Sequence, residues 1–504
     1  MNVEIKECQN CKQNFTIEPE DFLFYEKIHV PPPTWCPECR MIRRFCFYNQ
    51  RKFFRGKDFL DGKEILVGVH PESGIKTYER DYWWSDGWDP MVYGRDYDFA
   101  KTFFEQFREL LYAVPQPSRN TIQMLNSDYC NHCGWIKNSY LSFDLGDAEN
   151  TAYVVRAEYI KDSLDLYEAF HTELSYENYM SDDAYKVFFS INCEQCSDVW
   201  FSRNLAGCTN CFGCINLRGK SYYIFNKPHT KDSYEKFMAD FESGSFRTIE
   251  EMRKQTIDFW KLHPLKFTLS INTENSIGEL IERSKNLKYC YSVHECENLA
   301  YSQFMDSPGA DSYDASFNFR DFLLMYEVML GGLQSYGLKF CWNCWSSNNN
   351  LEYSAFCRSS TDLFGCVGLN NKQYCILNKQ YTKEDYFALR EKIIKHMNEV
   401  PFIGNRNLVY KYGEFFPPEF SPATYNETIA YDFFPLSEAE ARSKGFQWRG
   451  AEAQEYQITL KSADLSDRIE EVSNSILKET IGCASCNRSY RIIAPELDFY
   501  RRIP

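Results

Sequence analysis

The chain has 504 residues, which is long enough for several domains that each bury a core, and this length excludes a small disulfide-stabilised module. Apolar residues make up 44% and aromatic residues 17% of the chain, so the composition predicts a folded protein rather than a disordered one. The net charge of -15 excludes attraction of the whole surface to nucleic acid or anionic lipid, so such a contact would need a local basic patch.

The N-terminal residues carry charges where a secretory signal would need an apolar stretch, which predicts a cytoplasmic protein. The most apolar run, residues 321–333, is interrupted by Glu327 and is too short to span a bilayer, so we expect no membrane association. In a reducing compartment, 21 cysteines indicate thiols or metal ligands rather than a disulfide framework.

Two Cys-x-x-Cys pairs open the chain, Cys8 with Cys11 and Cys36 with Cys39. Each pair places two sulfur atoms on one side of a tight turn, and two pairs give the tetrahedral thiolate site that Zn2+ prefers. Four protein ligands leave no open position for water, so the predicted zinc is structural rather than catalytic. The alternative is four buried cysteines without a metal.

A basic segment, residues 40–57, follows directly, with seven basic residues, no acidic residue and interleaved aromatic residues. This composition can hold phosphates while aromatic rings stack on bases, so a nucleic-acid contact is one hypothesis. The alternative is that the segment docks against the acidic remainder of this chain. The candidate nucleic-acid-binding residues are Arg40, Arg43, Arg44, Arg51, Lys52, Arg55 and Lys57.

Residues 8–44, "CQNCKQNFTIEPEDFLFYEKIHVPPPTWCPECRMIRR", resemble the treble-clef zinc-ribbon module of a family of uncharacterised bacterial proteins. Two further segments carry the same resemblance, "WWSD.WDP" at residues 83–90 and "YGEFFPPE.SP..YNET.A" at residues 412–430. The resemblance therefore spans most of the chain. It implies that the two cysteine pairs hold zinc, and it supplies no activity.

Aromatic residues recur about every eleven or twelve residues in the middle of the chain, with Asn, Asp, Ser and Cys between them. Such a short period predicts short strands that turn repeatedly, as in a β-solenoid. A longer repeat is superimposed, because residues 211–237 align with residues 363–389. We therefore expect two solenoid blocks, each closed by a helix that begins after Thr230 or Thr382, since threonine can cap the first turn.

Cysteines recur within the solenoid repeat, several of them in Cys-x-x-Cys spacing. Four cysteines of the first block align with other residue types in the second block, a replacement that a metal site would not tolerate. They are Cys193, Cys196, Cys208 and Cys211. We predict that the solenoid cysteines are small buried residues stacked coil over coil.

Catalytic motifs are not evident: the chain has no Gly-rich phosphate loop, no Gly-x-Ser-x-Gly and no His-Glu-x-x-His. The pairs Asp162/Asp165 and Asp182/Asp183 would suit a carbohydrate-active enzyme, because parallel β-helices host such enzymes. The same residues are expected as turn formers in a solenoid. The sequence therefore predicts a protein without catalytic residues.

The C-terminal residues repeat the first module at a constant offset of 475 residues, which aligns Cys8 with Cys483 and Cys11 with Cys486. We therefore expect a second, incomplete zinc module, with Cys483 and Cys486 as its ligands. Its second cysteine pair would fall beyond Pro504 in a longer chain. Alternatively, cysteines from elsewhere or from a second copy complete the site, or the two remain free thiols.

The predicted fold is mainly β, with duplicated solenoid-like repeats, capping helices and flanking treble-clef zinc modules. The predicted segments are residues 1–57, the zinc module with its basic tail; 58–117, a connecting segment; 118–271 and 272–400, the solenoid blocks with their closing helices; 401–480, a proline- and aromatic-rich segment with a helix; and 481–504, the incomplete module.

The predicted function is a non-catalytic zinc-binding scaffold or adaptor, an accessory subunit of a nucleic-acid-handling complex. Its expected cofactor is structural Zn2+, and its expected partner is a protein or a ribonucleoprotein complex. The alternatives are a carbohydrate-active β-helix enzyme and a purely structural protein that forms oligomers, such as a homodimer.

Overall fold

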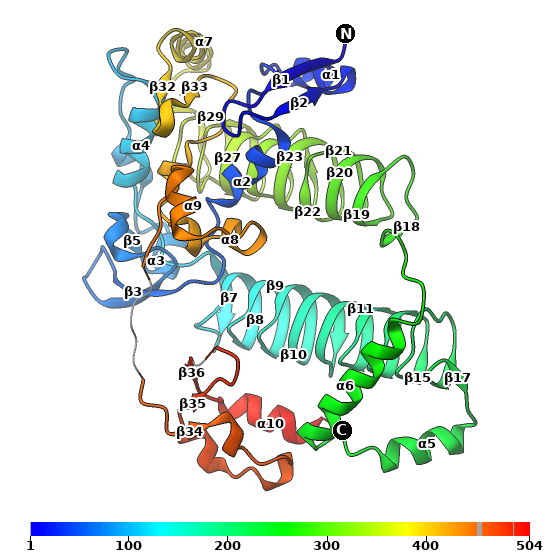
Figure 1. Ribbon diagram of the computed structural model, residues 1–504. Helices are drawn as coiled ribbons and strands as arrows, with labels where there is room; N and C mark the ends of the chain where they lie inside the picture. The colour runs from blue at the N-terminus through cyan, green and yellow to red at the C-terminus, as the bar shows by residue number, and fades with distance from the viewer. Residues whose placement is uncertain (1, 451–455, 487, 504) are drawn as a thin grey trace. The chain divides into compact units, whose positions relative to one another are not determined.

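The computed structural model describes residues 2–450, 456–486 and 488–503, which form a mainly β protein (Figure 1). Contacts divide the chain into two units. Unit 1 consists of Met1–Arg119 and Lys266–Gly450, and unit 2 consists of Asn120–Leu265 and Ala451–Pro504. The N-terminal module therefore belongs with the second solenoid, and the C-terminal module belongs with the first.

Unit 2 contains the first solenoid, whose strands are parallel except for the last, which pairs antiparallel with its neighbour. The strands are β7 (Thr121–Leu125), β8 (Asn131–Tyr140), β9 (Phe143–Ala152), β10 (Val155–Glu173), β11 (Tyr176–Phe188), β12 (Ile191–Glu194), β13 (Ser197–Trp200), β14 (Arg203–Ala206), β15 (Thr209–Phe212), β16 (Ser221–Ile224) and β17 (Lys227–Pro228). In the parallel ladder, paired residues lie twelve positions apart, as Cys133 and Leu145 do, and Leu145 and Ala157. This register confirms the twelve-residue coil.

Each coil of the first solenoid has four corners. Residues with positive φ recur at every third position, as at His132, Trp135, Asn138 and Leu141. Because a left-handed residue turns the chain, four of them in twelve residues divide the coil into four short sides. Asn and Asp tolerate this conformation best among non-glycine residues, which explains their abundance in the repeat.

The residue after each corner faces the interior and is usually small, as with the buried Cys133 and Ser139. Cys193 stacks between Ser181 and Leu205 of the neighbouring coils. Within the described ranges, the solenoid cysteines form no group of three ligand atoms close enough to hold a metal ion. Their burial and stacking confirm the prediction of small core residues.

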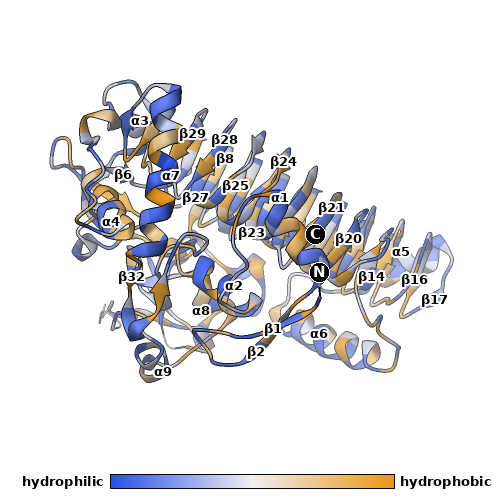
Figure 2. Cartoon of the chain, turned by 90° about the horizontal axis from the view of Figure 1, so that it is seen from above, coloured by the Kyte–Doolittle hydropathy of each residue, from blue (hydrophilic) through white to orange (hydrophobic). Residues whose placement is uncertain are grey.

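Unit 1 contains the second solenoid, whose main ladder is also parallel. Its strands are β18 (Ser270–Ile271), β19 (Ile277–Glu282), β20 (Lys285–His294), β21 (Cys296–Ala300), β22 (Gln303–Met305), β23 (Gly309–Phe319), β24 (Phe322–Leu323), β25 (Tyr326–Gly332), β26 (Ser335–Tyr336), β27 (Lys339–Trp345), β28 (Asn349–Glu352), β29 (Thr361–Phe364), β30 (Gln373–Ile376) and β31 (Lys379–Gln380). Figure 2 shows hydrophobic and hydrophilic residues interleaved along the coils.

Several coils of the second solenoid are one residue longer. Tyr326 pairs with Lys339, thirteen positions ahead, whereas Thr361 pairs with Gln373, twelve ahead. Two consecutive residues with positive φ, such as Arg320 and Asp321, recur every thirteen residues in the longer coils. This double corner explains why the aromatic spacing is less regular in the second block.

Helices close both solenoids, as predicted. In unit 2, Thr230 caps α5 (Lys231–Asp240) by accepting a hydrogen bond from the amide of Ser233, and α6 (Phe246–Trp260) follows. In unit 1, Thr382 caps α7 (Lys383–Glu399) by accepting from the amide of Asp385. The equivalent caps confirm that the two blocks are duplicated.

The remaining elements belong to the terminal modules and the connecting segments. They are β1 (Glu4–Glu7), β2 (Asn14–Ile17), α1 (Pro19–Lys27), α2 (Pro37–Phe45), β3 (Phe54–Lys57), β4 (Glu64–Val67), β5 (Thr77–Tyr78), α3 (Arg80–Trp84), α4 (Phe103–Ala113), β6 (Gln116–Pro117), β32 (Phe402–Ile403), β33 (Val409–Tyr410), α8 (Ile429–Phe433), α9 (Glu438–Ser443), β34 (Leu460–Lys461), β35 (Ile481–Gly482), β36 (Ser489–Tyr490) and α10 (Ala494–Arg502). No helix in the described part of the chain is both long enough and apolar enough to cross a bilayer.

Candidate metal centre and its docking network

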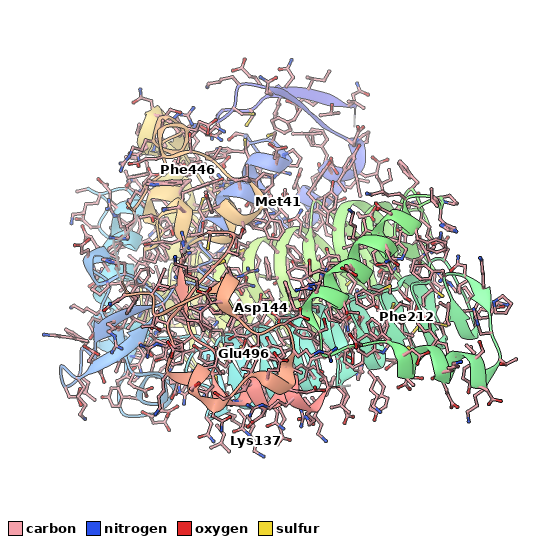
Figure 3. All side chains as sticks on the ribbon, turned by 60° about the horizontal axis from the view of Figure 1, so that its bottom comes forward. Met41, Lys137, Asp144, Phe212, Phe446 and Glu496 are labelled. Carbon is pink, nitrogen blue, oxygen red and sulfur yellow. The ribbon has the colours of Figure 1, made fainter. Side chains whose placement is uncertain are left out.

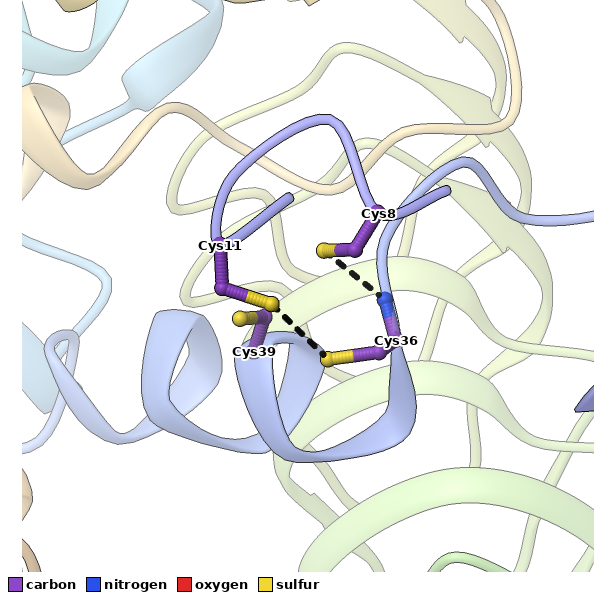
Figure 4. Close-up of side chains that lie close together, drawn as sticks. All are labelled: Cys8, Cys11, Cys36 and Cys39. Carbon is purple, nitrogen blue, oxygen red and sulfur yellow. Dashed lines mark hydrogen bonds between the residues drawn. The ribbon is translucent and has the colours of Figure 1, made fainter. Parts of the chain in front are cut away.

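Four cysteine sulfurs converge between the β1–β2 hairpin and the start of α2 (Figure 4). Cys8 and Cys11 lie in the turn that joins the two strands, Cys36 is the N-cap of α2, and Cys39 lies in its first turn. The four sulfur atoms all lie within 4.8 Å of one another. A set of four thiolates at this spacing could hold a metal ion, and it fits tetrahedral Zn2+ best.

Nearby donors orient the sulfurs. The amide of Cys36 donates a hydrogen bond to Cys8 Sγ at 3.2 Å, and Asn10 Nδ2 donates to Cys39 Sγ at 3.2 Å. An N–H group that donates to sulfur stabilises the thiolate form that a metal requires, so these two donors suit the predicted ligand set.

Three arginines of α2 are buried in unit 1. Arg40 Nη2 lies 2.9 Å from Asp314 Oδ2, and Arg44 Nη1 lies 3.3 Å from the other oxygen of the same carboxylate. Glu327 binds Arg43 at 2.5 Å and Arg44 at 3.1 Å. Three arginines thus meet corner carboxylates of the solenoid.

A third carboxylate completes this network, which joins segments far apart in the sequence. Glu414 binds Arg43 Nη1 at 2.7 Å and accepts a hydrogen bond from the hydroxyl of Thr34 at 2.5 Å. Burial raises the pKa of Asp314, whereas Arg40 and Arg44 act to lower it. Burial thus opposes the charged form of Asp314, and ion pairing with Arg40 and Arg44 offsets only part of this effect, because the pKa stays above its usual value.

This network corrects the nucleic-acid hypothesis for three residues. The guanidinium groups of Arg40, Arg43 and Arg44 face the solenoid of their own chain and are not accessible to a phosphate. The alternative prediction, that the basic segment docks against acidic residues of its own chain, is confirmed for these three arginines. The other four candidates, Arg51, Lys52, Arg55 and Lys57, are exposed, and Arg55 pairs with Glu64 of β4.

Helix α1 also docks on the second solenoid. Asp21 accepts hydrogen bonds from the hydroxyl of Tyr301 at 3.1 Å and from Lys288 at 3.2 Å. Phe24 stacks on Tyr313 with ring centroids 3.9 Å apart. The N-terminal module is therefore fixed to the coils by both of its helices.

The C-terminal module is a second copy of the same hairpin and helix. Gly482 pairs with Ser489 as Glu7 pairs with Asn14, which is the same register at an offset of 475 residues. Helix α10 has nine residues, as α1 has. Cys483 is half-buried and Cys486 is exposed, and in the described ranges they form no group with a third ligand.

The predicted carboxylate pairs lie at or next to solenoid corners, since Asp162, Asp165 and Asp183 have positive φ and Asp182 directly precedes a corner. Asp162 is the last member of a ladder of side-chain hydrogen bonds that joins corner residues of successive coils. In this ladder Asn126 donates to Asn138, Asn138 donates to Asn150 and Asn150 donates to Asp162. Arg502 of α10 also binds Asp162, at 3.2 Å. These contacts favour a structural role for Asp162. The ladder was not predicted, although its twelve-residue spacing is visible in the sequence.

The second carboxylate pair lies with a histidine on exposed coils. His171 Nδ1 lies 3.5 Å from Asp182 and 3.8 Å from Asp183. The three groups offer ligand atoms within 4.8 Å of one another, but acidic corner residues are common without a metal. We therefore assign no site to them.

Asp165 occupies the next corner, and burial, followed by Glu177 and Glu496, raises its pKa to about 7. Between about pH 4 and pH 7 the folded state therefore binds more protons at Asp165 than the unfolded state, so its contribution to stability falls as pH rises. We expect Asp165→Asn to stabilise unit 2 at pH 8, by up to about 4 kcal/mol, and to have little effect at pH 4.5. Urea unfolding at both pH values measures the difference, and an equal change at both would contradict the assignment.

Comparisons with known proteins do not identify this chain. No protein-family model and no curated protein matches it. A crystal structure of a candidate acetyltransferase from Desulfovibrio desulfuricans G20 is 10% identical, over 53% of this chain and 69% of that chain, with a TM-score of 0.11. A similarity at this level carries no argument about fold or activity.

Proposed function

We propose that this protein is a non-catalytic scaffold or adaptor in which a structural Zn2+ fastens the N-terminal module to a β-solenoid. The observation that carries the proposal is that α2 supplies both a cysteine pair of the metal centre and the three buried arginines that bind the solenoid. Four cysteine ligands leave no coordination position for water, so the ion would stabilise the fold.

The partner we propose is another protein, bound along the exposed aromatic side chains of the coils. Tyr167 and Tyr179 stack on adjacent coils with ring centroids 5.2 Å apart, and Tyr159 stacks on His171 at 4.9 Å. Tyr159, Tyr179 and Tyr185 are each more than 40% exposed. Aromatic residues are enriched at protein interfaces because they combine large apolar area with a polar tip, which supports an adaptor role.

Native mass spectrometry of the chain isolated with its partners tests this function. We expect one zinc per chain and a protein complex of fixed stoichiometry that Tyr159→Ala and Tyr179→Ala together weaken. Polysaccharide turnover that Asp162→Asn abolishes would favour the enzyme alternative and contradict the proposal. Matched substitution of Tyr289, an exposed tyrosine of the other solenoid, controls for general surface effects.

The exposed basic residues test whether the adaptor also contacts nucleic acid. With a net charge of -15 and the arginines of α2 buried, we expect a labelled single-stranded oligonucleotide to bind weakly, with a Kd of about 10⁻⁴ M or more at physiological salt. Changing Arg51, Lys52, Arg55 and Lys57 to glutamine should remove the salt dependence of that binding. Fluorescence anisotropy measures it, and submicromolar binding that survives the fourfold change would contradict this assignment.

A further inference from the structure

The two terminal modules dock on their solenoids through equivalent residues. Tyr301 donates a hydrogen bond to Asp21 at 3.1 Å in unit 1, and Tyr153 donates to Glu496 at 2.8 Å in unit 2. Asp21 and Glu496 occupy the same position in their modules, 475 residues apart. Figure 3 labels Glu496 among the side chains of unit 2.

Two more contacts repeat in the same way. The last residue of α1, Lys27, binds Asp311 at 2.8 Å, and the last residue of α10, Arg502, binds Asp162 at 3.2 Å. In both units the aspartate ends a ladder of corner asparagines. The docking is therefore duplicated along with the modules.

A pair of tyrosines extends the correspondence to the following coil. The rings of Tyr25 and Tyr326 lie 5.5 Å apart in unit 1, and those of Tyr500 and Tyr176 lie 5.5 Å apart in unit 2, both edge to face. Since Tyr25 and Tyr500 are equivalent module residues, Tyr326 corresponds to Tyr176.

These contacts identify the counterparts of the carboxylates that bind α2. Asp314 lies three residues after Asp311, and Asp165 lies three residues after Asp162. Glu327 directly follows Tyr326, and Glu177 directly follows Tyr176. All four carboxylates have positive φ and so occupy corners. Asp165 and Glu177 are thus the unit 2 equivalents of Asp314 and Glu327.

The two units differ in the cations that meet these carboxylates. In unit 1, Arg40 binds Asp314 and lies over the ring of Tyr301, 5.5 Å from its centroid. In unit 2, Arg253 of α6 binds Glu177 at 2.6 Å. Over the described ranges, no lysine or arginine pairs with Asp165. Tyr176 and Tyr500 interact electrostatically with Asp165, as their equivalents Tyr326 and Tyr25 do with Asp314 in unit 1.

We propose that the corner of unit 2 at Asp165, beside α10, is a docking site for a helix that begins Cys-x-x-Cys-Arg, as α2 does in unit 1. The arginine would bind Asp165 as Arg40 binds Asp314, because it directly follows the second cysteine. The cysteine pair would join Cys483 and Cys486 in a second four-cysteine site. Arg253 already meets Glu177, so the helix needs only this one arginine.

The recognition chemistry is specific in two ways. A guanidinium that replaces water at a partly buried carboxylate forms a charge-assisted hydrogen bond, and a zinc shared by two cysteine pairs fixes the orientation of the helix. A helix with the cysteines but without the arginine meets only the second requirement. This site goes beyond the proposed adaptor function, since it names the chemistry of a partner segment.

A synthetic peptide of residues 31–47, which contains α2, tests the site when it is added to the full chain with one further equivalent of Zn2+. We expect a 1:1 complex that holds one more zinc than the chain alone, measured by native mass spectrometry. In fluorescence anisotropy, Asp165→Asn in the chain or Arg40→Gln in the peptide should each weaken binding about tenfold.

Matched variants make every result decisive. Cys486→Ser in the chain should abolish zinc-dependent binding, whereas Asp183→Asn, on an exposed corner, should not change it. Absence of peptide binding overturns the docking site, and zinc-dependent binding that ignores Asp165→Asn overturns the arginine contact. Neither result affects the zinc of the N-terminal module, so the proposed function is tested separately.

Discussion

Glu327→Gln will lower the free energy of unfolding of unit 1 by about 3–5 kcal/mol, the usual cost of removing one partner from a buried ion pair. Glu327 binds both Arg43 and Arg44, and all three side chains are at most 1% exposed. The substitution keeps the volume of the side chain but leaves two buried guanidinium groups with one fewer carboxylate. Urea unfolding, with hydrogen exchange to assign the transition to unit 1, measures the loss.

Glu297→Gln is the matched control. It removes a carboxylate from the same solenoid, but the pair that Glu297 forms with Lys285, at 2.9 Å, is about half exposed. Exposed pairs contribute at most about 1 kcal/mol, because water screens them. Equal midpoints for wild type and Glu327→Gln would show that the network does not hold the module on the coils.

The solenoid and both modules could be predicted because their signals are local or periodic. The solenoid turns at every third residue and pairs residues twelve positions apart. This geometry requires small, turn-forming and aromatic residues at fixed spacing, so the period is visible in the sequence. The constant offset between Cys8 and Cys483 likewise revealed the second module, whose strand register is now seen to match.

The pairing of modules with solenoids could not be predicted, because it depends on contacts between distant segments. Asp314 and Glu327 look like ordinary turn formers, and nothing near them in the sequence indicates that they meet arginines about 270–290 residues away. For the same reason, the basic segment after Cys39 resembled a nucleic-acid contact. Charge alone does not distinguish a surface patch from a buried network whose partners are remote.

Cys39→Ser should reduce the zinc content from one ion per chain to nearly none and should destabilise unit 1 by several kcal/mol. Zinc-finger peptides gain about 10–16 kcal/mol from zinc, but here packing and ion pairs also hold α2, so we expect only part of that amount. Zinc analysis and thermal unfolding with and without a chelator measure both effects. Cys341→Ser, which changes a buried solenoid thiol of unit 1, should keep the zinc.

The two substitutions in unit 1 should not be independent, because Cys39 and Arg43 lie on the same nine-residue helix. Once the metal no longer holds the first turn of α2, the arginines of that helix are less firmly placed against Glu327. Glu327→Gln should therefore cost less in the Cys39→Ser background than in the wild type. Strict additivity in this double-mutant cycle would mean that the metal centre and the arginine network stabilise unit 1 separately, and that zinc does not fasten the module to the solenoid.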